Sequence, residues 1–557
     1  TLCGSSLCKE CGLIQYNGLA PESKLYFSDI GDSKSGDLIG TVDLDEQYKI
    51  FQQLNVHVSS NSWGYSTNEP EIQFNYNKAA FEHPDVLYVF ASGNNGQYNT
   101  INCPANAKNV LSVTSSEIIS AANFEISVTQ VDILNDSFKI TTREMMGGKI
   151  WQNSISPKML YLNNLSFVQY KGPECNIENC TESDFDYSSL YNNSIVLLNS
   201  DDDNVLCIQA LKVGFYGALA AIFSPEDYFL RCDETPKIPM IVIDNESISD
   251  LLKMGDKISI FPSSGTDDPL PSASFAASKG PADSGLRKPD IMAPGSHINS
   301  ARSHGPELEE NMTVSFLYRD NIADKSGTSM ATPAISGLAT IIVQYFNDGF
   351  YPYLMKGTGK SINPTSCLLR ALLVNTAEKP ENKEKTEKVP LSKHKNDVGY
   401  GFPFLQEILG FNKTGLRFAD NQSIGSNSHI VYSINIDSNS ADLYVTLVYL
   451  DPPLSIENEN IFFADLDLYV KGPDGLIYHG NNVSDGDTFS SIEKVVFERD
   501  IISPEGGEYE IHIVSNNFPI SDKKVPFSVV VNGPFNMSDI EKNPLQLKWR
   551  IADDDEC

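Results

Sequence analysis

The residues best suited to chemistry lie in Gly327-Thr328-Ser329-Met330-Ala331-Thr332-Pro333, directly before an apolar helical pattern from Thr332 to Tyr345. A serine in the first turn of a helix has its hydroxyl beside unpaired backbone N–H groups, which suits a nucleophile whose reaction develops negative charge. A serine before a helix is also an ordinary N-cap residue. Position alone therefore leaves both interpretations open for Ser329.

A second polar segment, Ala91-Ser92-Gly93-Asn94, follows Val86–Phe90, the most apolar strand candidate near it. Acyl transfer needs hydrogen-bond donors for the developing oxyanion, and the carboxamide of Asn94 is one such donor. Asparagine also tolerates positive φ, so in a glycine-rich loop it is equally a turn residue. Taken alone, Asn94 is open to both interpretations.

Together these segments resemble the subtilisin family of serine proteases. The heptapeptide around Ser329 resembles the family's nucleophile motif, and Lys288-Pro289-Asp290-Ile291-Met292-Ala293-Pro294-Gly295 resembles the stretch before it. The resemblance covers roughly residues 1 to 115 and 272 to 410. It implies that Ser329 attacks the scissile carbonyl while the Asn94 amide and the Ser329 N–H hold the oxyanion. The expected substrate-binding residues are Ser62, Trp63, Gly64, Ala91, Ser92 and Gly93, although Trp63 is open to a role in the core.

The family's catalytic Asp and His have no counterpart at the expected positions. In this family the chain order is Asp, His, Ser, and Thr1-Leu2-Cys3-Gly4 resembles the remainder of the helix that follows the histidine. None of the eight histidines stands in the family's histidine context. We therefore expect a missing N-terminal segment to carry the catalytic Asp and His. A degenerate, inactive protease is the alternative.

The chain is expected to contain three folding regions, the first of them interrupted. Strands alternating with helices predict an α/β, subtilisin-like parallel-sheet domain over residues 1–116 and 271–415. Within it we expect a strand at Lys24–Phe27 and a helix near Leu44 to Leu54. We also expect Asn94 and Ser329 each to follow a strand of this sheet. Residues 117–270 read as an α+β insert that resembles a protease-associated domain, a lid-like module without chemistry of its own. Short, regularly spaced strands predict a β-sandwich or jelly roll over residues 416–557.

The last region contains Asp465 and Asp467 in Ala464-Asp465-Leu466-Asp467-Leu468-Tyr469-Val470. Residues two apart in a strand share one face, and paired carboxylates with loop carbonyls are ligands for Ca²⁺. Asp465 and Asp467 are therefore candidate ligands for a structural Ca²⁺, and a solvated strand face is the other interpretation. No cofactor is required for the chemistry itself.

Composition limits the partners and the compartment. A formal charge of −32 argues against nucleic acid as a partner, and no tract has the roughly 20 apolar residues of a membrane span. Ten cysteines and ten Asn-x-Ser/Thr sequons favour an oxidising secretory route. Cys175 with Cys180 and Cys207 with Cys232 are candidate local disulfides. The expected location is extracellular, or the lumenal part of a larger membrane protein.

The sequence therefore predicts a secreted, glycosylated subtilisin-type serine endopeptidase that acts on protein or peptide substrates. The alternative is a non-catalytic subtilisin fold that binds a protein partner. An intact nucleophile motif together with Asn94 favours the enzyme, because a scaffold has no physical need for either.

Overall fold

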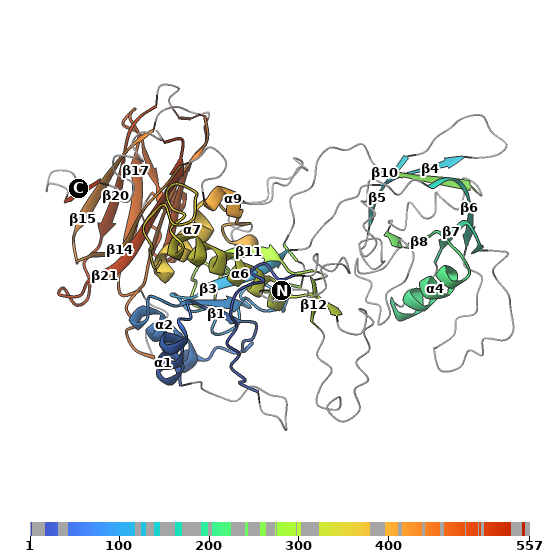
Figure 1. Ribbon diagram of the computed structural model, residues 1–557, viewed down its shortest axis with the longest axis horizontal. Coiled ribbons are helices and arrows are strands. Elements are labelled where there is room, and N and C mark those ends of the chain that lie inside the picture. Colours follow the sequence, from blue (N-terminus) through green and yellow to red (C-terminus); the bar gives the residue numbers. More distant parts are fainter. Residues whose placement is uncertain are drawn as a thin grey trace. The chain divides into compact units, whose positions relative to one another are not determined.

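The structure, a computed structural model, forms two compact units: Thr1–Ile118 with Pro271–Cys557, and Ile119–Leu270 (Figure 1). The described residues are 2, 17–31, 43–116, 124–129, 139–144, 162–169, 191–198, 203–223, 240–242, 257–262, 273–274, 276–296, 298–301, 322–378, 396–409, 415–436, 440–456, 462–484, 486–499, 501–502, 506–535 and 548–551.

A four-stranded parallel sheet organises the first unit. Its strand order is β1 (Val58–Asn61), β2 (Leu87–Ala91), β3 (Leu111–Ser116) and β11 (Ile291–Pro294). Every residue of β2 and β3 is buried. Buried parallel strands are typical of sheets with helices on both faces.

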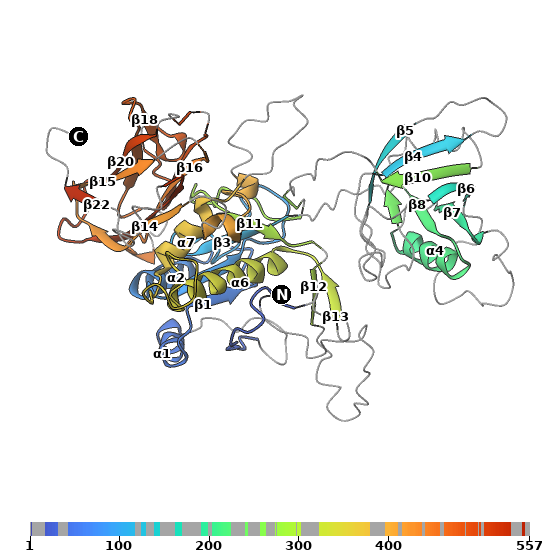
Figure 2. The ribbon, with the colours of Figure 1, turned by 45° about the horizontal axis from the view of Figure 1, so that its top comes forward.

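The side chains of β2 show those two faces. Leu87 and Val89 pack with α6 (Thr328–Asn347) and α7 (Ser366–Asn375). Tyr88 and Phe90 pack instead with α1 (Leu44–Leu54) and α2 (Pro70–Glu82). Figure 2 shows α6 running alongside the sheet. Contrary to the expectation from the sequence, one of the described helices, α6, is long and apolar enough to cross a bilayer. Most of its apolar residues are buried in this core.

Two expected elements near the sheet are different in the structure. The run Lys24–Phe27 reads as a strand in the sequence, but it has no regular secondary structure and exposes Leu25 and Phe27. An apolar run becomes a strand only where a partner completes its ladder, and no described strand pairs with it. Ser329 was expected to follow a strand of the parallel sheet. It follows β13 (Ile322–Lys325), which pairs with β12 (Ile298–Ala301) in a separate antiparallel ribbon.

The second unit is a closed barrel. Its strand order is β10-β4-β5-β9-β8-β7-β6, and α4 (Asp203–Phe215) joins β7 to β8. The strands are β4 (Phe124–Thr129), β5 (Lys139–Glu144), β6 (Leu162–Gln169), β7 (Ser194–Leu197), β8 (Ala220–Phe223), β9 (Met240–Val242) and β10 (Lys257–Pro262). Cys175, Cys180 and Cys232 lie outside the described residues, as does the side chain of Cys207.

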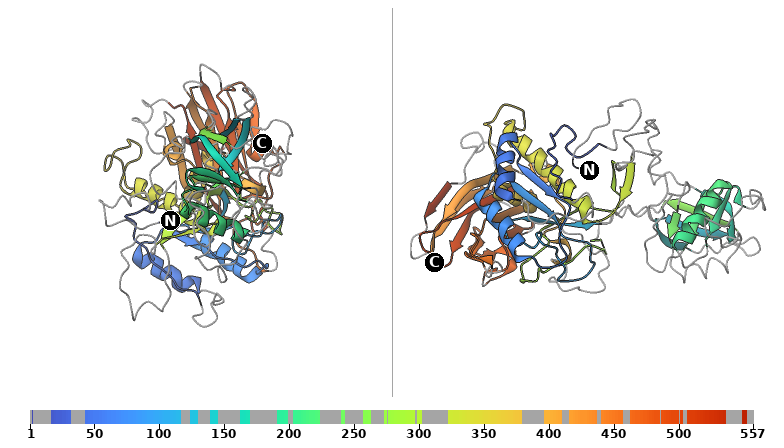
Figure 3. Two further views of the ribbon diagram at one scale, coloured as in Figure 1. Left: turned by 90° about the vertical axis from the view of Figure 1, so that its right-hand side faces the viewer. Right: turned by 90° about the horizontal axis from the view of Figure 1, so that it is seen from below.

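The C-terminal part of the first unit consists of two antiparallel sheets (Figure 3). Residues of both sheets contribute to one apolar core. The orders are β14-β21-β16-β19 and β18-β17-β20-β15-β22. The strands are β14 (Gly415–Ile424), β15 (His429–Ile436), β16 (Leu443–Tyr449), β17 (Leu466–Lys471), β18 (Ile477–His479), β19 (Ile492–Phe497), β20 (Gly507–Ser515), β21 (Val525–Gly533) and β22 (Lys548–Ile551). A 3₁₀ turn, η8 (Gly480–Asn482), follows β18, and the short helix α9 (Leu405–Ile408) precedes β14.

These sheets are tied to the α/β part by a shared core and by buried polar contacts. Helix α7 packs against β16 and β21, and Phe418 and Val530 join the core of α6. Lys108 Nζ lies 2.7 Å from Asp451 Oδ2, and both side chains are fully buried. The α/β part and the C-terminal sheets therefore form one packed body.

Candidate active site

Asn94 and the start of α6 are held together across 234 residues of sequence. β2 ends at Ala91, and the chain then passes through Ser92 and Gly93 to Asn94. Asn94 Oδ1 accepts hydrogen bonds from the backbone N–H of Thr328 (2.9 Å) and from the Thr328 hydroxyl (3.1 Å). With Oδ1 used in this way, the Nδ2 amino group is the end of the carboxamide available to another acceptor.

Two glycines make this close approach feasible. Gly327 has φ +143°, and a Cβ there would lie 3.2 Å from Asn94 Oδ1. Gly93 has φ +113°, and a Cβ there would lie 2.6 Å from both Asn102 Oδ1 and Ser278 Oγ. L-residues with side chains rarely adopt such φ values. The Gly-Thr-Ser and Ser-Gly-Asn segments therefore need glycine at these two positions.

Thr328 links the two segments, a role that the sequence analysis missed. Its Oγ1 accepts a hydrogen bond from the Gly93 N–H at 3.2 Å and lies 3.2 Å from the Gly93 carbonyl. The side chain is fully buried. Its place inside the Ser329 motif was visible in the sequence, but a contact with a segment 235 residues away was not.

Ser329 is the second residue of α6 and is half-buried. Its Oγ donates a hydrogen bond to the Ser62 carbonyl at 3.3 Å, and Ser62 Oγ donates to the Ser329 carbonyl at 2.7 Å. Backbone N–H groups in the first turn of a helix have no intrahelical acceptor. The hydroxyl, the first-turn N–H groups and the Asn94 segment thus lie together beside Ser62.

The other expected substrate-binding residues have different surroundings. Trp63 packs edge-on against Tyr76 and Phe90, and its Nε1 donates to Asn61 Oδ1 at 3.2 Å, so its indole belongs to the core around α2. Gly64 lies against the Cys103 carbonyl, where a Cβ would come within 2.9 Å. Ala91, Ser92 and Gly93 are buried. Contacts from these three residues to a peptide are therefore limited to their backbone.

The histidines among the described residues lie away from Ser329. His57 precedes β1, at the opposite end of that strand from Ser62. His83 ends α2, and His429, His479 and His512 belong to the C-terminal sheets. His297, His304 and His394 are outside the described residues. No imidazole in the described part of the chain is therefore placed to take a proton from Ser329.

An ion pair between Lys288 and Asp290, in the stretch before the nucleophile, stabilises the sheet. Lys288 Nζ lies 2.7 Å from Asp290 Oδ2, which also accepts the Ser112 N–H at 2.7 Å. Burial lowers the pKa of Lys288 to about 8, although the Asp290 charge opposes that shift. This pair joins β3 to the residues that enter β11.

Asp465 and Asp467 belong to a larger group, here called the acidic cluster, that also contains Asp487 and Glu493. Burial, followed by the charges of Asp467 and Asp487, raises the pKa of Asp465 to about 6. Burial and the same neighbouring charges raise the pKa of Glu493 well above its usual range. Within the described part of the chain, Asp465 Oδ1, Asp467 Oδ1 and Glu493 Oε1 are buried without a hydrogen-bond partner. Ionising all of these carboxylates therefore costs free energy that their surroundings only partly offset.

The sequence analysis missed two members of this cluster. Glu493 is 2% exposed, and its Oε2 accepts the Leu468 N–H at 2.7 Å. Asp487 Oδ2 is bonded by Arg287 Nη2 at 2.7 Å and by Asn481 Nδ2 at 2.8 Å. Glu493 lies on β19, in the opposite sheet from β17. Strand spacing places residues on a face, but it does not identify which faces meet.

Two cysteines are described in full, and both are free. Cys103 and Cys367 are buried, and burial raises the pKa of each thiol to about 12. These two thiols are therefore unreactive in the folded chain.

The subtilase family model, peptidase S8, matches residues 3–401. The chain belongs to the subtilase family. This confirms the resemblance to subtilisins and, with it, a serine-protease fold built on a parallel sheet.

Relatives of this subtilase include much longer proteins. It is 26% identical over 371 residues to the serine protease/ABC transporter B family protein tagD of Dictyostelium discoideum, covering 65% of this chain and 16% of tagD. It is 43% identical over 108 residues to tagB of the same organism, covering 18% of this chain and 5% of tagB. The chain thus spans a small fraction of these relatives.

Two further matches come from bacteria. Serine protease AprX of Bacillus subtilis is 43% identical over 72 residues, covering 13% of this subtilase and 16% of AprX. The crystal structure of the subtilisin-like protease Apa1 from Pseudoalteromonas sp. AS-11 is 13% identical, with a TM-score of 0.29, and covers 69% of this chain and 76% of that one.

Proposed function

We propose that this subtilase hydrolyses peptide bonds as an endopeptidase through an acyl-enzyme on Ser329. In the proposed reaction Ser329 Oγ attacks the scissile carbonyl carbon and its proton passes to a general base. The carbonyl oxygen becomes an oxyanion that Asn94 Nδ2 and the Ser329 N–H stabilise. The base then gives this proton to the leaving amine as the C–N bond breaks, and water hydrolyses the resulting ester and restores the Ser329 hydroxyl.

The observation that carries this proposal is the bond from the Thr328 N–H to Asn94 Oδ1. This hydrogen bond orients the Asn94 carboxamide so that its Nδ2 amino group is available. Its donor, Thr328, is the residue before the nucleophile. Donors that are already oriented need no rearrangement when charge develops, which is why they lower the barrier to reaction. An inert scaffold has no need for this arrangement.

We further propose that the general base and its orienting carboxylate come from a segment outside these 557 residues. The positions of the described histidines support this. The extended chain, meaning this chain together with that segment, is expected to cleave a casein substrate. The 557-residue chain alone is expected to lack triad-dependent cleavage.

Ser329→Ala in the extended chain separates the proposed mechanism from the alternative of a protein-binding module. Loss of cleavage with unchanged circular dichroism supports the enzyme. Undiminished cleavage by Ser329→Ala would overturn the role of Ser329. An extended chain that folds but cleaves nothing would instead favour the binding module.

Two further proposals rest on narrower grounds. The unit Ile119–Leu270 is proposed to be a protease-associated lid that gates substrate, with support from β7, α4, β8 and β9 in the order of the motifs that suggested it. The chain is proposed to work outside the cell or in a secretory lumen. Three described sequon asparagines, Asn192, Asn421 and Asn482, are exposed as glycosylation requires.

Ca²⁺ is proposed to bind the acidic cluster. The fit rests on three buried carboxylate oxygens that have no hydrogen-bond partner among the residues described, since oxygen-rich, negatively charged sites suit this ion. The carboxylates repel one another, and no three of them are gathered within 4.8 Å. Cation binding would therefore draw them closer. Asp465 and Asp467 would supply ligands, and the ion would offset charge that now destabilises the folded chain.

A further inference from the structure

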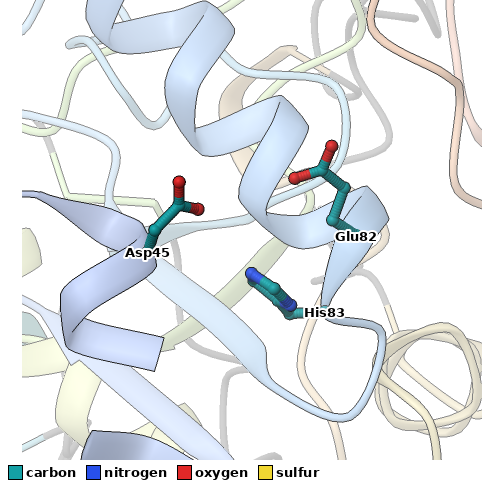
Figure 4. A group of neighbouring side chains, drawn as sticks. All are labelled: Asp45, Glu82 and His83. Atoms are coloured by element: carbon teal, nitrogen blue, oxygen red, sulfur yellow. The ribbon is translucent and has the colours of Figure 1, made fainter. Parts of the chain in front are cut away.

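Asp45, Glu82 and His83 bring three potential metal ligands together on the opposite face of the sheet from α6. Asp45 lies in the first turn of α1, Glu82 is the last residue of α2, and His83 is its C-cap. One ligand atom from each lies within 4.8 Å of the other two, and in the described ranges this is the one such group of His, Cys, Asp and Glu side chains. Figure 4 shows the imidazole and both carboxylates facing one another.

The imidazole is held firmly in place. Its ring stacks on Tyr48 with 3.4 Å between ring centroids and 13° between planes. The Tyr48 hydroxyl donates to Asp85, with oxygens at 2.9 and 3.1 Å. Tyr48 lies one turn beyond Asp45 on α1. The ring therefore needs little reorganisation to bind a ligand, which is the condition under which a site binds well.

The Nε2 atom of His83 gives a separate reason to expect a ligand at this group. This nitrogen is shielded from solvent and has no hydrogen-bond partner among the residues described. A buried polar atom without a partner is costly and is uncommon in native proteins. Coordination of a metal ion through Nε2 would satisfy this atom, since an imidazole nitrogen is a common metal ligand.

The donor set selects the class of ion. One imidazole nitrogen with two carboxylate oxygens suits zinc and similar first-row transition ions, whereas Ca²⁺ and Mg²⁺ prefer oxygen alone. Ligands on a tetrahedral zinc, about 2.0–2.1 Å from the metal, are about 3.4 Å apart. Ligand atoms within 4.8 Å of one another therefore need to close by about 1.4 Å at most. Asp45 and Glu82 are exposed, which gives the ion a path in.

We propose that Asp45, Glu82 and His83 bind a Zn²⁺ ion that joins the first turn of α1 to the end of α2, with water completing the coordination. One contact competes with the metal: Lys78 Nζ lies 3.5 Å from Glu82 Oε2. Both partners of that ion pair are substantially exposed, so it is weak and easily displaced.

The test is calorimetric titration of the EDTA-treated, dialysed 557-residue chain with ZnCl₂ at pH 7.5. The expected result is one site with a dissociation constant in the micromolar range that millimolar CaCl₂ does not block. His83→Gln and Asp45→Asn should each weaken binding at least tenfold. Lys78→Gln should tighten it, because Glu82 loses its competing cation. His479→Gln, on the C-terminal sheets, is the matched control and should leave binding unchanged.

Substituting Co²⁺ for Zn²⁺ gives an independent readout, since visible d–d absorption of a tetrahedral site should appear in the parent and vanish in His83→Gln. Asp45→Asn changes an exposed side chain and keeps the measurement valid if His83→Gln fails to fold. No saturable binding below 100 µM Zn²⁺ overturns the proposal. Binding that is equally tight in the parent and in Asp45→Asn also overturns it.

Discussion

The Ser329 region and the acidic cluster differ in whether their buried polar groups have hydrogen-bond partners. Around Ser329, Asn94 Oδ1, Thr328 Oγ1 and both serine hydroxyls have partners, and two glycines allow the backbones to approach. In the acidic cluster, three buried carboxylate oxygens have no partner among the described residues, whereas near Ser329 the group left without one is the neutral hydroxyl of Ser92. Both regions belong to the same compact unit. The difference is therefore local and does not reflect a loosely packed structure.

The contrast shows what each region is prepared to receive. A site whose acceptors are occupied and whose donors are free is prepared for negative charge that appears during a reaction. A group of close, partly buried carboxylates is prepared for a positive ion. Whether buried polar groups have hydrogen-bond partners thus distinguishes a candidate catalytic centre from a candidate cation site.

Lys108→Met should have the largest effect, because it converts a paired carboxylate into an unpaired one beside the acidic cluster. Asp451 would lose its cationic partner at 2.7 Å and keep the N–H groups of Phe463 and Ala464 while remaining fully buried. Breaking a buried ion pair from one side costs about 3–5 kcal/mol of unfolding free energy. Lys471→Met, which breaks an exposed 3.3 Å pair with Glu510, should cost about 0–1 kcal/mol in the same urea titration. If the two variants lost equal amounts of unfolding free energy, the expected cost of leaving a buried charge unpaired beside the acidic cluster would be contradicted.

Asn94→Ala in the extended chain should lower kcat by about 10² to 10³ with little change in KM, since the lost hydrogen bond forms mainly in the transition state. Steady-state hydrolysis of a peptide substrate measures both constants. Asn95→Ala removes the neighbouring exposed carboxamide and should leave kcat within about twofold. An unchanged kcat in Asn94→Ala removes that residue from the site.

Ca²⁺ should stabilise the chain through the acidic cluster. At a calcium concentration of about 100 times Kd the gain is about 2.7 kcal/mol, which corresponds to a rise in Tm of a few degrees for a chain of this size. Asp467→Asn should remove most of that rise, whereas Asp522→Asn, in an exposed turn, should retain it. A calcium-dependent rise that survives in Asp467→Asn would place the ion elsewhere.

The smallest effect concerns pH. The pKa of Asp465 is about 6 in the folded chain against an ordinary value of 3.8, so the folded state holds a proton that the unfolded state has lost. Its contribution to stability therefore falls as pH rises from about 4 to about 6. In EDTA, the Tm of Asp465→Asn relative to the parent should rise across that window and level off above it. A flat difference would show that Asp465 ionises normally.

Local sequence patterns predicted the features that depend only on residues close together in the chain. The helix over Leu44–Leu54 was predicted at its observed bounds, and its N-cap Asp43 accepts from the N–H groups of Asp45 and Glu46. The subtilisin resemblance, which the family match confirms, rested on contiguous motifs. Such motifs are visible because neighbouring residues act together.

Long-range pairing was not predictable in the same way. Nothing in the residues around Thr328 indicates its bond to Gly93, and nothing near Asp467 indicates that Glu493 of another sheet lies against it. Trp63, read as a substrate residue with a core role left open, packs in the core because Tyr76 and Phe90 meet it there. These contacts depend on which faces pack together, and a single sequence does not encode this in any local pattern.

The most direct test of the central claim, that Ser329 is the nucleophile, is labelling with a biotinylated fluorophosphonate followed by peptide mapping. In the extended chain we expect rapid modification of Ser329 alone and none in Ser329→Ala. In the 557-residue chain we expect only slow labelling, because the proposed general base lies outside it. Label on another serine, or no label in an extended chain that cleaves peptides, would contradict the account.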